Sequence, residues 1–297
     1  MSMVTEQDEH SKYLGQFIPL QYHHVMLMDA NRMKNFKAAI EHVVAPGARV
    51  LELGGGTGVL SWFAAARADK VWCVEFNREL VTEARRFLGM NANGGKVEVV
   101  HADAFEYLPP EPVDVMICEM VHVAMLREKQ IEMVESFKQR YRKRFGPTLP
   151  TLVPTAVVMA VQPLQKEYDF EGFQAPIIQV EELGGNAPRT LDLAAPAVYS
   201  VLDYTLDNAL DIAWDGTVAI EHGGVVNALR FITRNILALV MEKNSTIDWL
   251  NRYMSFPLRT PVSVQAGDTL RIRFRYRAGD FISVLMDALH VEVVRQA

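Results

Sequence analysis

The sequence predicts an α/β protein in which a mostly parallel sheet is followed by an antiparallel β-barrel domain. Between residues 30 and 145, helix-like segments alternate with short apolar strands, and strands spaced by helices pair in parallel through right-handed crossovers. Three prolines interrupt this rhythm between residues 144 and 155. Beyond them, strand-like runs are separated by Gly, Asp and Pro, which is typical of an antiparallel barrel or sandwich.

Four strands are expected in the first half of the chain: RVLEL (49–53), KVWCVE (70–75), KVEVV (96–100) and VDVMICE (113–119). The stretch RFGPTLPTLVPT (144–155) cannot continue a helix, because proline has no backbone N–H and clashes with the preceding turn. We place the domain boundary there, with domains at residues 1–150 and 151–297. The chain is long enough for two cores, since single cores stop growing at roughly 250 to 300 residues.

The second domain contains six expected strand-like runs: AVVMAVQPL (156–164), PAVYSVLDYTL (196–206), LDIAWDGTVAIEHG (210–223), ALRFITRNILALVM (228–241), TPVSVQAGDTLRIRFRYRAGD (260–280) and FISVLMDALHVEVV (281–294). In TLRIRFRYR, apolar residues alternate with arginines, so one face is apolar and the other is positive. We interpret the arginines as a solvated outer face that guards the sheet, and an anion-binding stripe is the alternative.

The composition excludes several classes of function. The chain is 49% hydrophobic and 22% charged, as in soluble globular proteins, and no apolar run approaches the roughly 18 to 20 residues that span a bilayer. The amino terminus lacks the features of a secretory signal, so we expect a cytoplasmic protein without a membrane partner. A net charge of −6 argues against nucleic acid as a partner. Cys73 and Cys118 lie in apolar runs and should be buried and inert; no metal site is predicted.

A glycine-rich turn follows the first expected strand. Gly54, Gly55, Gly56 and Gly58 precede a helix-like segment, and glycines at a helix amino terminus let the backbone approach a ligand closely. A dinucleotide-binding loop has the spacing G-x-G-x-x-G, but position 59 is Val, so NAD and FAD are disfavoured. A plain tight turn is the structural alternative.

The turn resembles the S-adenosylmethionine site of the class I methyltransferases, whose Rossmann-like domain has an acidic residue at the end of its second strand. The resemblance implies that Glu75 accepts hydrogen bonds from both ribose hydroxyls, a task suited to an ionised carboxylate. HADAFEYL (101–108) resembles the segment that meets the adenine, which implies Asp103 as an acceptor and the Ala104 backbone as a donor. The glycines at positions 54, 56 and 58 would complete this cofactor site.

Two glutamates frame the segment after the fourth expected strand. Glu119 follows that strand directly, at the sheet edge where open α/β folds bind ligands, and Glu128 follows in the same loop. Since 36 of 297 residues are acidic, such a spacing also arises by chance. Solvated loop residues are therefore the alternative interpretation.

The whole set resembles the protein arginine methyltransferases, whose double-glutamate loop has the form E, eight residues, E. Three further segments support this resemblance. YLGQFIPLQYHHVMLMDANRM (13–33) resembles the family's amino-terminal motif, TLVPTAVVMAVQ (151–162) its crossing into the barrel, and STIDWLNRYMSFPL (245–258) its threonine-histidine-tryptophan loop. The residues in register are Tyr13, His23, Met26, Asp29, Arg32 and Trp249.

The resemblance implies an enzyme that transfers a methyl group from S-adenosylmethionine to a guanidinium nitrogen of arginine. Glu119 and Glu128 would be catalytic, while Met26 and Arg32 would belong to the cofactor site, with Arg32 at the cofactor carboxylate. A guanidinium is planar and offers five donors, so two carboxylates can grip it and leave the attacking nitrogen's lone pair more available. The family also commonly dimerises through an arm on the barrel domain, which implies a homodimer.

Several departures from the family pattern leave the substrate open. Met120 and His122 replace a tryptophan and a glycine, Phe17 replaces a tyrosine, and Asp248 takes the place of the loop histidine, where we expect it beside Asp29. We expect the substrate to be an arginine in a protein or peptide, and the alternative is a free small guanidine, amine or other metabolite. In a smaller guanidine, a second cation such as the α-ammonium of a free amino acid would pair with Asp248. His122 is a proton acceptor or a hydrogen-bonded wall residue. A non-catalytic cofactor-binding scaffold is the third alternative.

Overall fold

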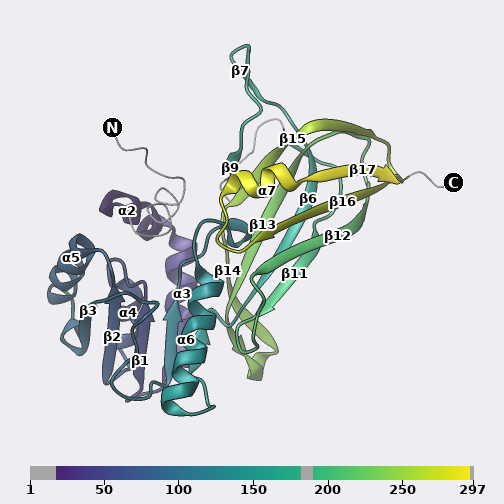
Figure 1. Cartoon of the computed structure of the whole chain (residues 1–297). Helices are drawn as coiled ribbons and strands as arrows, with labels where there is room; N and C mark the ends of the chain where they lie inside the picture. Colours follow the sequence, from purple (N-terminus) through teal and green to yellow (C-terminus); the bar gives the residue numbers. More distant parts are fainter. Residues whose placement is uncertain (1–17, 182–189, 295–297) are drawn as a thin grey trace, which may run out of the picture.

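The computed structural model describes residues 18–181 and 190–294, which form two parts. The first part contains a five-stranded parallel sheet with helices around it, and the second part is built of antiparallel strands (Figure 1). This architecture confirms the predicted fold class.

The parallel sheet has the strand order β3-β2-β1-β4-β5. β1 (Arg49–Leu53) and β2 (Lys70–Glu75) span the residues expected from the sequence, and β3 (Val97–His101) and β4 (Val115–Cys118) lie within two residues of their expected ranges. β5 (Thr151–Val153) pairs in parallel with β4. The sheet therefore extends past the domain boundary expected at residue 150, because the short stretch between two prolines can still serve as an edge strand.

Helices flank this sheet: α2 (Leu20–Met28), α3 (Ala30–Val43), α4 (Val59–Ala65), α5 (Arg78–Gly89) and α6 (Gln130–Phe145), with short 3-10 turns at Gly94–Lys96 and Val123–Met125. Capping side chains determine where two of these helices, α3 and α5, begin. The Asp29 carboxylate accepts a hydrogen bond from the Arg32 backbone N–H (2.8 Å), and Asn77 caps α5. In Figure 1, α3 and α6 lie between the parallel sheet and the antiparallel strands.

The second part contains a seven-stranded and a three-stranded antiparallel sheet. The strands are β6 (Ala156–Lys166), β9 (Gln179–Glu181), β10 (Thr190–Asp192), β11 (Ala197–Asp203), β12 (Asp211–Ala219), β13 (Gly224–Val240), β14 (Ser245–Leu250), β15 (Tyr253–Val264), β16 (Thr269–Arg277) and β17 (His290–Val294). β13 is the central strand, since it pairs with β6, β14 and β15. A small hairpin of β7 (Asp169–Phe170) and β8 (Phe173–Gln174) projects from the rest of the chain (Figure 1).

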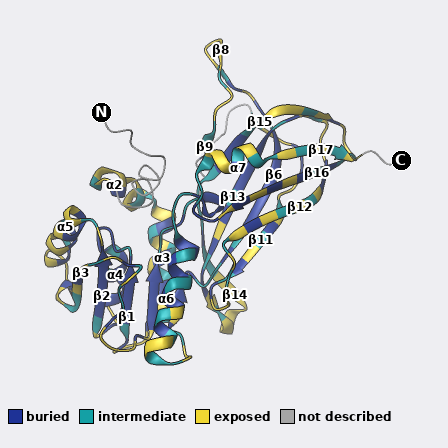
Figure 2. Cartoon of the chain, in the orientation of Figure 1, coloured by how far each residue is buried: buried dark blue, intermediate teal, exposed yellow. Residues whose placement is uncertain are grey.

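The alternation expected in β16 is present. Leu270, Ile272, Phe274 and Tyr276 are buried, and Phe274 makes edge-to-face contacts with Phe231 and Tyr199 in the core between the sheets. The arginines face outward and pair with carboxylates, as Arg271 does with Asp215 (two contacts of 2.7 Å). This confirms the solvated outer face. Figure 2 shows the parallel strands as mostly buried and the β7–β8 hairpin as largely exposed.

The strand expected over residues 281–294 is only partly correct. Residues Ile282–Ala288 form a helix, α7, and β17 follows it. Ile282, Leu285 and Met286 have the spacing of one helix face and pack on the core, and this packing outweighs the strand preference of the local sequence.

Both cysteines are free and buried, as expected. Among the described residues, no helix is long and apolar enough to cross a membrane.

Candidate active site

The glycine-rich turn at the carboxyl end of β1 requires its glycines. Gly54, Gly56 and Gly58 have φ values of +77°, +54° and +79°, a region that side chains disfavour. A Cβ atom on Gly55 would lie 2.2 Å from the Cys73 sulfur, and one on Gly56 would lie 2.8 Å from the His23 ring. The turn therefore packs tightly against β2 on one side and α2 on the other.

Glu75, at the end of β2, is held by two backbone amides. Its carboxylate accepts a hydrogen bond from the Gly56 N–H (2.8 Å) and another from the Asn77 N–H (2.7 Å), and the residue is buried. Asp103, in the loop after β3, accepts a hydrogen bond from the Phe105 N–H (2.8 Å). Each carboxylate oxygen has a second lone pair, so both groups can also accept bonds from a ligand.

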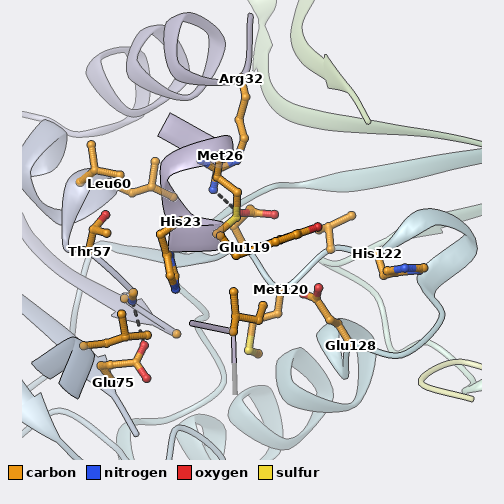
Figure 3. Close-up of a pocket in the computed structure, with 18 of the residues that line it drawn as sticks. His23, Met26, Arg32, Thr57, Leu60, Glu75, Glu119, Met120, His122 and Glu128 are labelled. Atoms are coloured by element: carbon orange, nitrogen blue, oxygen red, sulfur yellow. Dashed lines mark hydrogen bonds and ion pairs between the residues drawn. The ribbon is translucent and has the colours of Figure 1, made fainter. Parts of the chain in front are cut away.

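These residues line a cavity of about 570 Å³ between the strand ends, α2, α3, the loop after β4 and the β14–β15 turn. Figure 3 shows part of its lining, with Glu75 and Glu128 on opposite sides of Met120 in this view. Nearly all the site residues expected from the sequence line this one cavity: Met26, Arg32, Gly54, Gly56, Glu75, Asp103, Ala104, Glu119 and Glu128. Gly58 is absent from the lining, because it faces Leu88 and Ala84 instead.

Two buried polar atoms in the cavity wall have no hydrogen-bond partner within the described chain, Nε2 of His23 and Nε of Arg32. Burial and the nearby Arg32 charge lower the pKa of His23, which favours its neutral form. Buried polar atoms are nearly always hydrogen-bonded in native proteins. Their lack of a partner here indicates that the cavity receives a polar ligand.

Arg32 forms a buried ion pair with Glu119 through its Nη2 atom (Figure 3). Its guanidinium also lies 5.4 Å from the Phe36 ring centroid and 5.8 Å from that of Trp249, which is within the range of cation–π attraction. The residue expected at the cofactor carboxylate is therefore also the partner of the first glutamate.

Glu128 has a different electrostatic environment. Burial, reinforced by the charge of Glu119, raises the pKa of Glu128 to about 8, although Arg127 and Arg32 oppose the shift. Two carboxylates that share a site cannot both ionise easily without a cation between them. The pair is thus prepared for a positively charged ligand.

The loop that carries both glutamates is held mainly by the antiparallel part of the chain. Thr233 Oγ1 accepts a hydrogen bond from the Ala124 N–H, and the Tyr276 hydroxyl donates to the Ala124 carbonyl (both 2.8 Å). The Asn251 side chain donates to the Val121 carbonyl (3.3 Å). At the start of α6, the buried Gln130 amide bonds the residues on either side of Glu119: it accepts from the Met120 N–H and donates to the Cys118 carbonyl (both 2.8 Å).

Comparisons with known proteins agree with this geometry. The family described as "Methyltransferase domain" matches residues 50–143. Arginine N(omega)-methyltransferase of Streptomyces achromogenes subsp. streptozoticus is 25% identical over 92% of this chain and 80% of that protein. Protein arginine N-methyltransferase 2 of Xenopus tropicalis is 32% identical over 49% of this chain, which spans only 34% of the frog protein.

The fold comparison covers almost the whole chain. A chain of the Trypanosoma brucei PRMT1 enzyme-prozyme heterotetrameric complex with AdoHcy has a TM-score of 0.71 at 17% identity, covering 91% of this chain and 96% of that chain. The chain is a divergent class I methyltransferase similar to the protein arginine methyltransferases.

The structure of this methyltransferase gives the positions of two residues, Asp248 and His122, whose roles the sequence left open. Asp248 does not lie in the cavity lining; its carboxylate pairs with Arg234 (2.7 Å). The indole N–H of Trp249, and not Asp248, points to Asp29 (3.4 Å). The expected Asp248–Asp29 contact is therefore wrong, because adjacent residues on strand β14 face opposite sides. Tyr13 and Phe17 lie outside the described residues.

His122 is a wall residue of the methyltransferase cavity. Its ring Nδ1 lies 3.1 Å from the Val123 carbonyl, and burial lowers the pKa of His122 to about 4. Sequence reasoning missed the contributions of Thr233, Gln130 and Asn251. Thr233 and Gln130 lie in patterns typical of an ordinary strand and helix, and no local signal marks them as partners of the loop that carries the glutamates.

The two glutamates should affect the stability of the ligand-free methyltransferase in opposite directions. Glu119→Gln removes the charge that neutralises buried Arg32 and should lower the free energy of unfolding by roughly 1.5 to 3 kcal/mol, the range for hydrogen bonds to charged groups. Because the pKa of Glu128 is raised on folding, its wild-type contribution falls as pH rises from about 4.5 to about 8. Glu128→Gln should therefore raise Tm, increasingly so across that window.

Thermal melts at pH 5, 7 and 9 measure both effects, with Glu41→Gln on the exposed face of α3 as the control. A Glu128→Gln difference in Tm that does not change with pH, or a Glu119→Gln protein as stable as wild type, would contradict these assignments.

Proposed function

We propose that the protein transfers a methyl group from S-adenosylmethionine to a nitrogen of a guanidinium group, carried by arginine in a protein or peptide or by a small guanidine. The observation that carries this proposal is the pair Glu119 and Glu128, which line one cavity, where burial and the charge of Glu119 raise the pKa of Glu128. A guanidinium is permanently charged and offers donors in a fixed fork, so it satisfies two neighbouring carboxylates at once.

S-adenosylmethionine is the cofactor of this class of enzyme, and it supplies a methyl group on a positively charged sulfur. The cavity fits it, since Arg32 Nε and His23 Nε2 lack hydrogen-bond partners among the described residues and the lining carboxylates of Glu75 and Asp103 keep free lone pairs. Glu75 would accept from the ribose hydroxyls and Arg32 would bind the carboxylate. Gly54, Gly56, Met26, Asp103 and Ala104 would complete the binding site.

The two glutamates would act on the guanidinium. Their carboxylates accept its N–H groups, which concentrates positive charge on the held nitrogens and orients the remaining nitrogen toward the methyl group. Methyl transfer leaves one proton too many on the attacking nitrogen. A Glu128 oxygen is suited to receive this proton, because burial and Glu119 raise the pKa of Glu128 to about 8.

The two parts of the chain would have different roles in the reaction. The parallel sheet and its helices would hold the cofactor, and the antiparallel domain would shape the substrate site and support a homodimer. The β7–β8 hairpin fits the second role because it projects from the chain and exposes Phe170 and Phe173 (Figure 1). The trypanosome protein belongs to a heterotetrameric complex, so assembly occurs in a protein of this fold.

Glu75→Ala should weaken the binding of S-adenosylhomocysteine by roughly 1.5 to 3 kcal/mol, because a charged acceptor is lost. Glu75→Gln keeps one acceptor oxygen, so its affinity for S-adenosylhomocysteine should lie between those of the wild type and Glu75→Ala. Titration calorimetry on proteins with wild-type circular dichroism measures this, and unchanged affinity in Glu75→Ala would remove Glu75 from the cofactor site.

Glu119→Gln and Glu128→Gln should each lower kcat/KM by roughly 100-fold or more, as the loss of a group that stabilises transition-state charge does elsewhere. In the wild type, kcat/KM should rise with pH by up to about tenfold per unit until the pH reaches about 8, because a protonated Glu128 cannot hold the cation. Radiolabelled methyl transfer to a panel from free arginine to arginine-rich peptides is the assay. Cofactor binding without transfer to any member would favour the non-catalytic scaffold.

Phe173→Asp should convert a homodimer to monomers, since it replaces an apolar side chain, 71% exposed in the single chain, with a charged one. Light scattering after size-exclusion chromatography gives the mass, with Val201→Asp on β11 as an exposed apolar control. A wild-type monomer, or a dimer that survives Phe173→Asp, would argue against assembly through this hairpin.

A further inference from the structure

The loop that carries the two glutamates connects β4 to α6. Glu119 is the first residue after β4, and Glu128 lies two residues before the start of α6. Both glutamates line the same cavity (Figure 3). The separation of their carboxylates therefore depends on how the end of β4 is joined to the start of α6.

The neighbouring strands do not hold the backbone at Glu119. The pairing of β4 with β1 ends at Cys118, and its pairing with β5 ends at Ile117. The Glu119 carboxylate forms an ion pair with Arg32, but Arg32 is also the residue expected at the cofactor carboxylate. A contact that stays unchanged when ligands bind would therefore have to act on the backbone around Glu119.

The side chain of Gln130 makes such a contact. Its amide accepts a hydrogen bond from the Met120 N–H and donates one to the Cys118 carbonyl (both 2.8 Å), so it bonds the backbone on both sides of Glu119. A primary amide offers a donor and an acceptor side by side, as a neighbouring strand would. Gln130 is 1% exposed and does not belong to the described lining of the cavity. It can therefore influence a ligand in the cavity through the residues that it holds.

We propose that Gln130 is a positioning residue that sets the spacing between Glu119 and Glu128. This inference rests on the proposed function. Because α6 begins with Gln130, two residues after Glu128, its bonds around Glu119 join the two ends of the loop. A guanidinium is a rigid planar fork, so two carboxylates grip it best at one separation. The antiparallel domain shapes the middle of the loop, whereas Gln130 fixes its ends relative to each other.

The opposite end of β4 offers a matched comparison. Tyr141, also on α6 and also buried, bonds both backbone groups of one residue: its hydroxyl accepts from the Val113 N–H (2.9 Å) and donates to the Val113 carbonyl (3.1 Å). Val113 lies just before β4, whereas Glu119 follows it. Tyr141→Phe therefore removes two comparable hydrogen bonds away from the glutamates.

Gln130→Met removes the amide from a side chain of similar length. It should lower kcat/KM for the methylated guanidine by roughly 10- to 100-fold, since a misplacement of about 1 Å can have an effect of this size. The Kd for S-adenosylhomocysteine should stay close to the wild-type value, because Glu75 and the glycine turn are unchanged. Tyr141→Phe should lower Tm but leave kcat/KM and this Kd unchanged. Radiolabelled methyl transfer, titration calorimetry and thermal melts measure the three quantities.

A double-substitution cycle distinguishes positioning from a purely structural role. If Gln130 acts through Glu119, adding Gln130→Met to a Glu119→Gln protein should reduce kcat/KM little further, because the charge that Gln130 positions is already lost. Independent effects would instead multiply.

Gln130→Glu provides a second test in case Gln130→Met does not fold. A protonated carboxylic acid offers one donor and one acceptor, as the amide does, whereas an ionised carboxylate only accepts. The ratio of kcat/KM in Gln130→Glu to that in the wild type should therefore be highest at low pH and fall as pH rises, because the Cys118 carbonyl loses its donor. A ratio as low at pH 6 as at pH 9 would contradict the role assigned to the amide.

The outcomes separate the inference from the proposed function. Unchanged kcat/KM in Gln130→Met, losses that multiply in the double variant, or an equal loss of cofactor affinity would each overturn the inference and leave guanidine methylation standing. A wild-type protein that binds S-adenosylhomocysteine but methylates no guanidine would overturn the proposed function, and the inference with it.

Discussion

The geometry of this site depends on hydrogen bonds between the loop after β4 and the antiparallel domain. Ala124, Met125 and Arg127 in that loop have φ values of 56°, 56° and 61°, a conformation that costs non-glycine residues roughly 1 kcal/mol or more each. Backbone and side-chain bonds from the second domain offset this. The Gly279 N–H donates to the Met125 carbonyl and the Arg127 N–H to the Asp280 carbonyl (both 2.8 Å), in addition to the bonds from Thr233 and Tyr276.

The same loop places two glutamates in unlike electrostatic states. Glu119 is neutralised by Arg32, whereas Glu128 reduces its charge by retaining a proton, as its raised pKa indicates. Without a ligand, the site thus avoids two uncompensated charges in one cavity. A bound guanidinium would supply the missing positive charge, so substrate binding and the ionisation of Glu128 are linked.

Local patterns predicted much of the fold and most of the residues that line the cavity. β1 and β2 match their expected ranges because their apolar runs are buried on both faces of a parallel sheet, and the glycine turn and Glu75 belong to one continuous motif. Features that depend on distant residues could not be predicted. Asp248 turned out to face Arg234 because the side of β14 on which it lies is set by pairing with β13. The Arg32–Glu119 ion pair joins residues that lie 87 positions apart.

The dependence of the glutamate loop on the second domain bears on how such an enzyme can evolve or be redesigned. The segment that matches the general methyltransferase family ends at residue 143, so it includes both glutamates but none of the residues of the antiparallel domain that shape their loop. A gene segment transplanted with those limits would carry both glutamates without the residues that set the conformation of their loop. Thr233 and Tyr276 must therefore be inherited together with the two glutamates. Recombination between the two halves of the gene would be tolerated only among relatives that share these hydrogen bonds between the loop and the antiparallel domain.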